Sequence, residues 1–243
     1  MTESILSDLR ACALEIGAVV QSHRGRGFSG IRETQYHLDI AADEVALRML
    51  RGSGYRVVSE ESGATGDESV TIVVDPIDGS TNCDRGVPFY ATSLAAFRGS
   101  ELVAGLVMNH STGTIFEAEK GGGATRDGEP ISPSGAHTIA DSVISFSGWP
   151  SRDLGWAQVR ALGAASLEIC LVADGSLDAF TVAQNSTLNP WDYLAGLLVV
   201  REAGAVASDY RGERLDMFEA KVRRPIFCAT SELLANILEE GPL

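Results

Sequence analysis

Cysteine is scarce in this chain, and its few copies form no recognisable site. The 243 residues contain four cysteines, at Cys12, Cys83, Cys170 and Cys228. They show neither the close pairs of a zinc site nor the spacing of a disulfide framework. The four histidines also form no metal-binding pattern, and the sequence offers no Ser-His-Asp triad. These absences argue against a disulfide-stapled module, a zinc site and a triad hydrolase.

Basic residues are few, and long apolar runs are missing. The chain has 19 Lys and Arg against 33 Asp and Glu, a net charge of −14, and no basic tract. This balance disfavours nucleic acid as a partner. No apolar run is long enough to span a membrane, and the first residues lack the basic and apolar regions of a signal peptide. We therefore expect a cytoplasmic protein with neither nucleic acid nor membrane as a partner.

What the sequence does contain is an apolar segment that leads directly into two carboxylates. Residues 70–74 predict a buried strand, which places Asp75 at the carboxyl end, where open α/β sheets tend to bind ligands. Asp78 is expected on the turn that follows, and Pro76 and Gly79 suit that turn. Carboxylates at such a position can hold a hard cation.

The next residues add groups that bind anions. Gly79, Ser80 and Thr81 can open a helix whose free backbone N–H groups point at a phosphate. Together with the two acids they predict a metal site built for a phosphate ester. The local alternative is that Asp75 and Asp78 only cap a turn.

Two further segments carry acids at the start or end of a predicted element. A short β-branched strand, residues 55–59, ends at Glu60 and Glu61. Pro190 and Asp192 open a predicted helix. Here the local alternative is simple helix capping by the acid in the first turn.

Taken together, these segments resemble the three signature motifs of the inositol monophosphatase superfamily, in the same order. They are Glu60-Glu61, Asp75-Pro76-Ile77-Asp78-Gly79-Ser80-Thr81 and Trp191-Asp192-Tyr193-Leu194-Ala195. Weaker matches fill the intervals, so that the resemblance covers nearly the whole chain. It implies an α/β (α+β) fold, a layered αβαβα sandwich of the inositol monophosphatase/fructose-1,6-bisphosphatase type. It also implies a phosphoric monoester hydrolase that uses magnesium-activated water.

The resemblance assigns roles residue by residue. It implies two or three Mg²⁺ ions per site, with Mn²⁺ as a substitute, because two such ions can clamp the attacking and leaving oxygens. The implied metal ligands are Glu60, Asp75, the carbonyl of Ile77, Asp78 and Asp192. The implied catalytic residues are Glu60, Asp75, Asp78, Ser80, Asp192 and Asp43. The implied substrate- and phosphate-binding residues are Asp78, Gly79, Ser80, Thr81 and Asp192.

One acid of the site should come from an earlier helix, where two candidates lie four residues apart. Asp39 and Asp43 therefore share a helical face. The resemblance slightly favours Asp43 as the acid that positions water or a third ion. Asp39 is the alternative for the same role. The alternative for each is an ordinary solvated acid on a helix surface.

The sequence indicates the reaction more clearly than it indicates the substrate. After Phe180, inositol-specific members carry a glutamate, whereas this chain reads Thr181-Val182-Ala183. The stretch 183–188 resembles archaeal-type enzymes that also accept fructose bisphosphate. We therefore expect a sugar or polyol phosphate, inositol monophosphate or fructose 1,6-bisphosphate. The alternatives are 3'-phosphoadenosine 5'-phosphate or histidinol phosphate, or a catalytically silent phosphate-binding regulatory protein. The resemblance also implies lithium sensitivity and a homodimer.

The 44% hydrophobic composition allows one compact unit or two closely packed halves. Residues 1–132 are expected to form an α+β half with most metal ligands. Residues 133–243 are expected to form an α/β half with Asp192 and the substrate-side loops. The expected elements are a helix over 5–20, a strand meander at 94–97, 102–108 and 114–118, a turn-rich stretch at 121–135, a strand at 143–147, and helices at 162–173, 193–202 and 231–240. Near residues 22–30, Arg24, Arg26 and Arg32 either touch phosphate or belong to a solvated connector.

Overall fold

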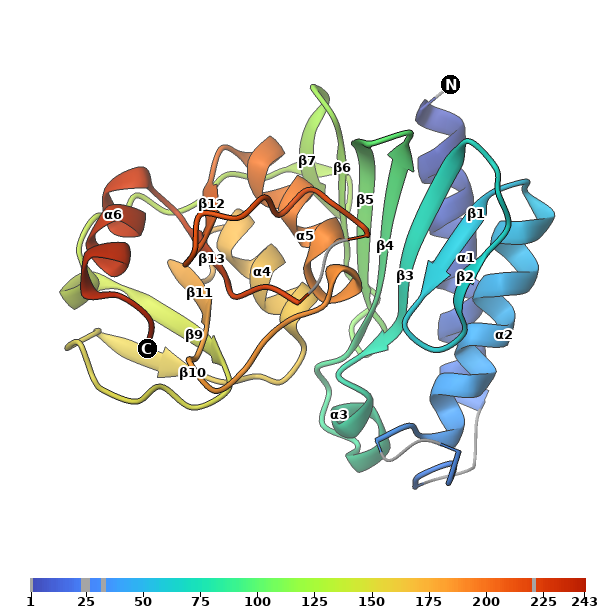
Figure 1. Ribbon diagram of the computed structural model, residues 1–243, viewed down its shortest axis with the longest axis horizontal. Helices are drawn as coiled ribbons and strands as arrows, with labels where there is room; N and C mark the ends of the chain where they lie inside the picture. Colours follow the sequence, from blue (N-terminus) through green and yellow to red (C-terminus); the bar gives the residue numbers. More distant parts are fainter. Residues whose placement is uncertain (1, 23–26, 32–33, 220–221) are drawn as a thin grey trace.

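The computed structural model describes residues 2–22, 27–31, 34–219 and 222–243 (Figure 1). The helices are α1 (Thr2–Ser22), α2 (His37–Gly52), α3 (Ser80–Arg85), α4 (Ala165–Ala173), α5 (Pro190–Ala203) and α6 (Ser231–Glu240), with a 3-10 turn η1 (Ile139–Asp141). Over the described residues, none of the helices combines the length and the apolar character needed to cross a bilayer. Arg24, Arg26 and Arg32, which the sequence suggested as phosphate contacts, lie outside the described residues.

The first sheet has eight strands in the order β2-β1-β3-β4-β5-β6-β7-β8. They are β1 (Arg56–Ser59), β2 (Gly63–Thr65), β3 (Val70–Asp78), β4 (Ala91–Arg98), β5 (Glu101–Asn109), β6 (Ile115–Glu119), β7 (Gly123–Arg126) and β8 (Glu129–Pro130). Strands β1 and β3 are parallel, whereas β3 to β8 pair antiparallel in succession. The predicted meander is therefore confirmed as β4, β5 and β6.

The second sheet has five strands in the order β10-β9-β11-β13-β12. They are β9 (Val143–Ser147), β10 (Gln158–Arg160), β11 (Ala179–Val182), β12 (Val206–Asp209) and β13 (Pro225–Cys228). The central strands β9 and β11 run parallel, and β13 runs antiparallel to β11. Strand β11 is fully buried, as the β-branched and aromatic run Phe180-Thr181-Val182 allows.

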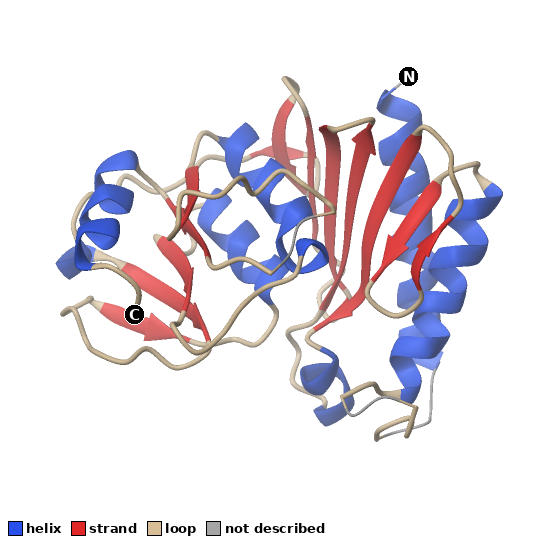
Figure 2. Cartoon of the chain, in the orientation of Figure 1, coloured by secondary structure: helices blue, strands red, loops and turns tan. Residues whose placement is uncertain are grey.

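The two sheets and the helices α1, α2, α4, α5 and α6 stack in layers, and the short α3 lies at the end of the first sheet (Figures 1 and 2). Helices α1 and α2 cover one face of the first sheet, and α4 and α5 lie between the two sheets. Helix α6 covers the far face of the second sheet. Because α1, α2, α4, α5 and α6 pack apolar residues against the sheets, this arrangement forms three apolar clusters. The predicted αβαβα sandwich is confirmed.

The predicted division into residues 1–132 and 133–243 follows the change of sheet between β8 and β9. The largest apolar cluster nevertheless contains side chains of both parts. Val73 and Phe97 of the first sheet share it with Leu167 and Tyr193 of the middle helices. The division therefore stays a prediction, and the two halves share one core.

Some predicted boundaries are wrong, each for a local reason. The helix expected over 162–173 begins only at Ala165, because Gly163 adopts φ 85° and the amides before the helix bind the side chain of Glu168. The helix with the apolar stretch 193–202 does begin at Pro190, the first helical position that the sequence indicated. The turn-rich stretch 121–135 contains the short strands β7 and β8.

Candidate metal centre

The parallel pair β1 and β3 brings two acids to one edge of the first sheet. Ser59 lies opposite Val74 in the register, and the Glu60 N–H donates to the Val74 carbonyl at 3.1 Å. Glu60 therefore leaves β1 beside Asp75 of β3. This is the juxtaposition that the two strand ends predicted.

Helix α5 brings a third acid from the other half of the chain. The Ser93 hydroxyl of β4 donates to the Trp191 carbonyl at 3.0 Å and fixes the start of α5 against the sheet. Asp192 then follows in the first turn, where one carboxylate oxygen accepts the Asn189 N–H at 2.7 Å. Asp192 thus does cap the helix, as the local alternative proposed, but the cap uses only its Oδ2 atom. The other oxygen of Asp192 stays available to the neighbouring acids.

Three carboxylates converge at this place. Glu60, Asp75 and Asp192 each offer an oxygen within 4.8 Å of the other two. Among the described residues, no Lys or Arg forms an ion pair with Asp75 or Asp192. Like charges this close repel strongly away from water, and a hard cation relieves that repulsion. An oxygen-only donor set of this kind fits Mg²⁺.

The pKa values of these acids record the same repulsion. Burial, and then the charges of Glu61 and Asp78, raise the pKa of Glu60 from 4.5 to about 7. Burial, and then the neighbouring carboxylates, raise the pKa of Asp75 and of Asp192 well above the ordinary value of 3.8. In the absence of a cation, the folded protein therefore holds protons at this site near neutral pH.

These shifts predict that the metal-free protein loses stability as the pH rises from about 4.5 to about 7. In this window the folded state binds more protons than the unfolded state, so the free energy of unfolding falls with pH. Glu60 alone, with a pKa moved from 4.5 to about 7, accounts for about 3 kcal/mol. Urea unfolding in a chelator at pH 4.5 to 8 measures the slope.

Two variants control this measurement. Glu60→Gln removes one of the raised groups and should flatten the slope, whereas Asp67→Asn, at an exposed loop position, should leave it unchanged. Magnesium added at pH 8 should restore the lost stability. A stability that stays level or rises between pH 4.5 and 7 in chelator would contradict the proposed repulsion.

Asp78 lies beside the three converging carboxylates, as the last residue of β3 and not on the following turn as predicted. Its two oxygens accept the N–H groups of Ala165 at 3.2 Å and Ser166 at 2.7 Å, and the Ser166 hydroxyl at 2.5 Å. Burial raises the pKa of Asp78 to about 6, and these hydrogen bonds limit the rise. Asp78 thereby joins β3 to the first turn of α4. Its place as a metal ligand stays a prediction.

The turn after Asp75 has the geometry of a tightly held loop. The Ile77 N–H donates to Asp75 Oδ1 at 3.0 Å, and the Ser80 hydroxyl donates to the Ile77 carbonyl at 2.7 Å. Gly79 adopts φ 85°, and a Cβ there would lie 3.0 Å from the Gly163 carbonyl. Only glycine fits both the conformation and the space. Asp75 therefore caps the turn, as the local alternative proposed, and it can still serve as a ligand of a bound ion.

Of the two acids on α2, Asp39 is the one whose charge raises the pKa of the converging carboxylates. Both are buried, at 3% and 6% exposure for Asp39 and Asp43, so the surface alternative is wrong. The charge of Asp39 contributes to the raised pKa of Glu60 and of Asp75, and burial raises its own pKa to about 6. Asp43 instead accepts the hydroxyl of Ser59. The charge contribution links Asp39 to the converging carboxylates, whereas Asp43 is bonded to the residue just before Glu60, and the choice between the two stays a prediction.

Sequence reasoning missed several polar residues around the site. Ser166 binds Asp78, and the buried Glu168 accepts the N–H groups of Leu162 at 3.0 Å and Gly163 at 3.2 Å. Burial raises the pKa of Glu168 to about 6. A glycine followed five residues later by glutamate was a signal for this loop, but only a three-dimensional view connects it to Asp78.

A cavity of about 320 Å³ opens next to Asp78 and Asp192. Its wall includes Ser147, Gly148 and Gly163. This volume lies in the range of sites for small molecules. The cavity therefore offers room for a small ester beside the acids.

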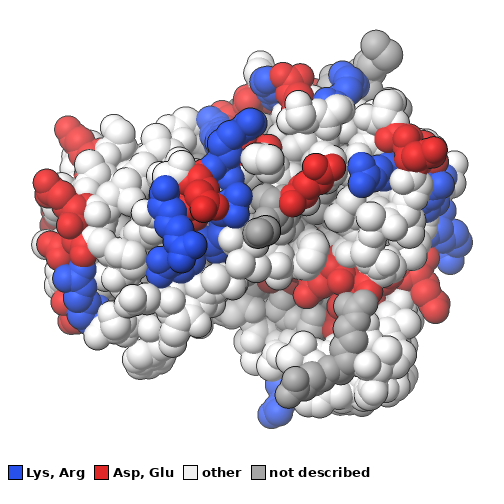
Figure 3. Space-filling model, in the orientation of Figure 1, with Lys and Arg blue, Asp and Glu red and all other residues white. Residues whose placement is uncertain are grey.

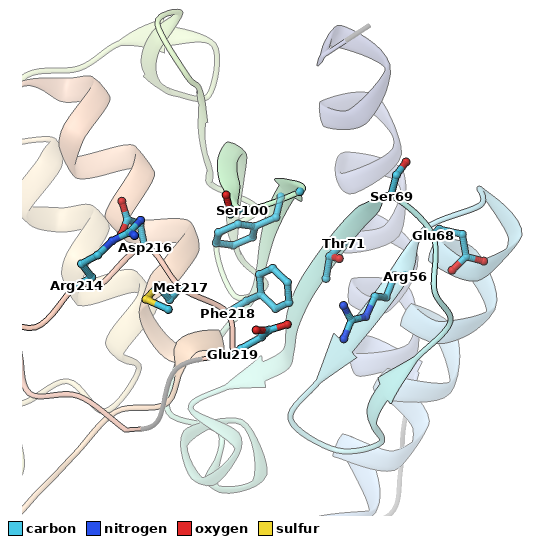
Figure 4. A pocket seen from close by; sticks show the side chains of 12 residues that line it. Arg56, Glu68, Ser69, Thr71, Ser100, Arg214, Asp216, Met217, Phe218 and Glu219 are labelled. Carbon is cyan, nitrogen blue, oxygen red and sulfur yellow. The ribbon is translucent and has the colours of Figure 1, made fainter.

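A second cavity, of about 410 Å³, lies at the opposite end of β3 (Figure 4). There the Arg56 guanidinium lies 5.5 Å from the ring centre of Phe218, which packs edge-on against Phe97. Thr71, near the start of β3, lines this cavity. It contains none of the converging carboxylates and is separate from the candidate metal centre.

Several arginines of the C-terminal half form ion pairs. Figure 3 shows Lys and Arg side chains gathered on one face of this half. Arg201 and Arg214 both bind Asp216, at 3.4 and 3.0 Å, and Arg223 binds Glu213 at 2.8 Å. These pairs reduce the positive field of the face.

Comparisons with known proteins agree with this geometry. The sequence profile of the inositol monophosphatase family matches residues 3–241. A fructose-1,6-bisphosphatase/inositol-1-monophosphatase of Archaeoglobus fulgidus is 34% identical over 207 residues, which cover 83% of this chain and 81% of that protein. The Nus factor SuhB of Salmonella typhimurium is 30% identical over 223 residues, which cover 84% and 82%.

A solved structure extends the agreement to the fold. The crystal structure of an inositol monophosphatase-fructose 1,6-bisphosphatase superposes with a TM-score of 0.84 at 29% identity, covering 96% of this chain and 98% of that one. Fold, acidic site and relatives together define the class as a phosphatase. The chain belongs to the inositol monophosphatase family.

Proposed function

We propose that this protein is a magnesium-dependent phosphatase that hydrolyses a small sugar or polyol phosphate monoester. Inositol monophosphate and fructose 1,6-bisphosphate are the first candidate substrates. The observation that carries the proposal is the convergence of Glu60, Asp75 and Asp192 within 4.8 Å, beside a cavity of about 320 Å³. The relatives named as phosphatases of these two esters support it.

The metal ligands follow from the residues that line this place. Glu60, Asp75 and Asp192 would hold Mg²⁺, with Asp78 and the Ile77 carbonyl as the further ligands implied by the resemblance. When bound, magnesium supplies positive charge that acidifies water and offsets the charge of the phosphate. Two or three ions, and Mn²⁺ as a substitute, remain part of the proposal.

The chain's own groups would bind and orient the reactants. The Gly79, Ser80 and Thr81 amides lie at the start of α3 and are proposed to hold phosphate oxygens. The Ser80 hydroxyl, beside the Ile77 carbonyl, would orient the attacking water. Asp39, or in the alternative Asp43, would accept a hydrogen bond from that water.

The cavity bears on the choice of substrate. The stretch after Phe180 contains no acid, and Thr181 and Val182 of β11 and the following Ala183 are fully buried, so this stretch offers no carboxylate to a ligand. The cavity wall includes Phe146, Ser147 and Gly148, and its acids are Asp78, Asp192 and Glu168. The absence of a carboxylate from the stretch after Phe180 supports acceptance of fructose bisphosphate as well as inositol phosphate, the two esters in the name of the archaeal relative.

A substrate panel tests the proposal. Phosphate release is measured from inositol 1-phosphate, fructose 1,6-bisphosphate, 3'-phosphoadenosine 5'-phosphate and histidinol phosphate, each with magnesium and with chelator. We expect magnesium-dependent release from one of the first two, at least about a hundredfold above the chelator control. A lithium series at limiting magnesium tests the proposed inhibition. Release only from one of the last two esters would replace the sugar or polyol assignment.

A catalytically silent, phosphate-binding regulator is the second candidate, favoured by the relative named as a Nus factor. It predicts magnesium binding without phosphate release from any ester. The homodimer and the cytoplasmic location stay predictions from the resemblance. Size-exclusion chromatography with light scattering measures the first of them.

A further inference from the structure

The two aspartates of the central motif can face the same way only because β3 contains a bulge. Successive strand residues point to opposite faces, so Asp75 and Asp78, three residues apart, would face opposite sides of a regular strand. In the register, Asp75 lies opposite Ser93 and Asp78 opposite Ala91. Two residues of β3 thus face the single residue Thr92 of β4. This extra residue returns Asp78 to the side of Asp75.

The bulge leaves a carbonyl without its partner in the strand ladder, and a side chain replaces that partner. The Thr92 hydroxyl donates to the Pro76 carbonyl at 2.7 Å. The same hydroxyl lies 2.7 Å from Nε2 of His110, the residue after β5. Thr92 is fully buried and His110 is 5% exposed. Hydrogen bonds therefore run from His110 through Thr92 to the Pro76 carbonyl. Pro76 belongs to the segment 75–78, which we call the metal loop.

The direction of each hydrogen bond follows from counting protons. Because a carbonyl only accepts, the single Thr92 proton goes to Pro76, and the hydroxyl must accept from His110. Nε2 of His110 therefore carries the hydrogen. Nδ1 is left as a lone pair without a hydrogen-bond partner among the described residues. It lies against Gly17 of α1, where a Cβ would come within 2.9 Å.

We propose that Thr92 and His110 are positioning residues that hold the β3 bulge, so that Asp75, the Ile77 carbonyl and Asp78 face one metal site. His110 fixes the direction of the Thr92 hydroxyl, and the hydroxyl fixes Pro76 between two of these groups. Gly17 allows α1 to close over the imidazole and keep water away. The inference rests on the proposed function, because it gives the metal loop its shape.

Matched variants test the positioning role. Thr92→Val keeps the shape and removes both hydrogen bonds, whereas Thr92→Ser keeps the hydroxyl. His110→Leu removes the donor, whereas His110→Gln retains an N–H donor near the position of Nε2. Each protein is stripped of metal with chelator and titrated with Mg²⁺ by calorimetry. Thr92→Val and His110→Leu should bind Mg²⁺ about 10- to 100-fold more weakly than the parent. The Ser and Gln variants should stay within about threefold of the parent.

A measurement that needs no metal tests the geometry directly. Nitrogen NMR of the imidazole should show His110 protonated at Nε2 and bare at Nδ1 in the parent protein. Protonation at Nδ1 would overturn the proposed hydrogen-bond chain, and so would parental Mg²⁺ affinity in folded Thr92→Val. If Thr92→Val does not fold, His110→Leu and the NMR result decide. Absence of Mg²⁺ binding in the parent, with Nε2 protonated, would instead defeat the proposed function.

Discussion

Asp75→Asn is expected to abolish magnesium-dependent turnover, with a fall in kcat on the order of 10³ or more. Asp75 is one of the three converging carboxylates and is 2% exposed, so its charge is directed to this site and not to water. An amide keeps the shape and can still accept the Ile77 N–H, but it loses the charge that a hard cation requires. Steady-state phosphate release and calorimetric magnesium titration measure the two consequences.

The same substitution has an opposite effect on the metal-free fold. Removing one of three mutually repelling carboxylates should raise the free energy of unfolding at pH 8 in chelator. Asp67→Asn, an exposed change of the same kind, provides the control and should alter neither turnover nor stability. Parental magnesium affinity in Asp75→Asn would remove Asp75 from the metal site.

Asp192→Asn is expected to lower kcat by about 10² to 10³ with the fold intact. The amide oxygen can still accept the Asn189 N–H that caps α5, so the helix keeps its first turn. What is lost is the negative charge that helix α5 delivers to Glu60 and Asp75. Turnover is compared with thermal unfolding on the same preparation.

Asp192→Ala separates capping from catalysis. It removes the cap as well, so its free energy of unfolding should be about 1 kcal/mol below that of Asp192→Asn, in addition to the loss of turnover. If Asp192→Asn retained full activity while Asp192→Ala lost only stability, Asp192 would be a helix cap and no more.

Much of the fold could be predicted because local pattern and tertiary structure agree. The apolar run before Asp75 forms the buried strand β3, and the strands around it pair as a meander because short turns join them. Pro190 marks the start of α5 for the same local reason that made it a capping signal. The resemblance to a family then supplied the order of the layers, which periodicity alone does not give.

The parts that could not be predicted depend on contacts between distant segments. No local pattern states that Asp78 would bind Ser166, 88 residues away, or that Thr92 would meet His110. The choice between Asp39 and Asp43 depends on contacts with distant segments, such as the hydrogen bond from Ser59 to Asp43. Helical spacing places both on one face and cannot distinguish them.

The most direct test of the account is phosphate release from fructose 1,6-bisphosphate and inositol 1-phosphate by the chelated protein as magnesium is added back, with Asp75→Asn measured beside it. The account predicts no release before addition, a steep rise with magnesium in the parent, and none in Asp75→Asn at the same concentrations. Equal release by parent and variant, or release that is indifferent to magnesium, would contradict the claim that these carboxylates form the catalytic metal site.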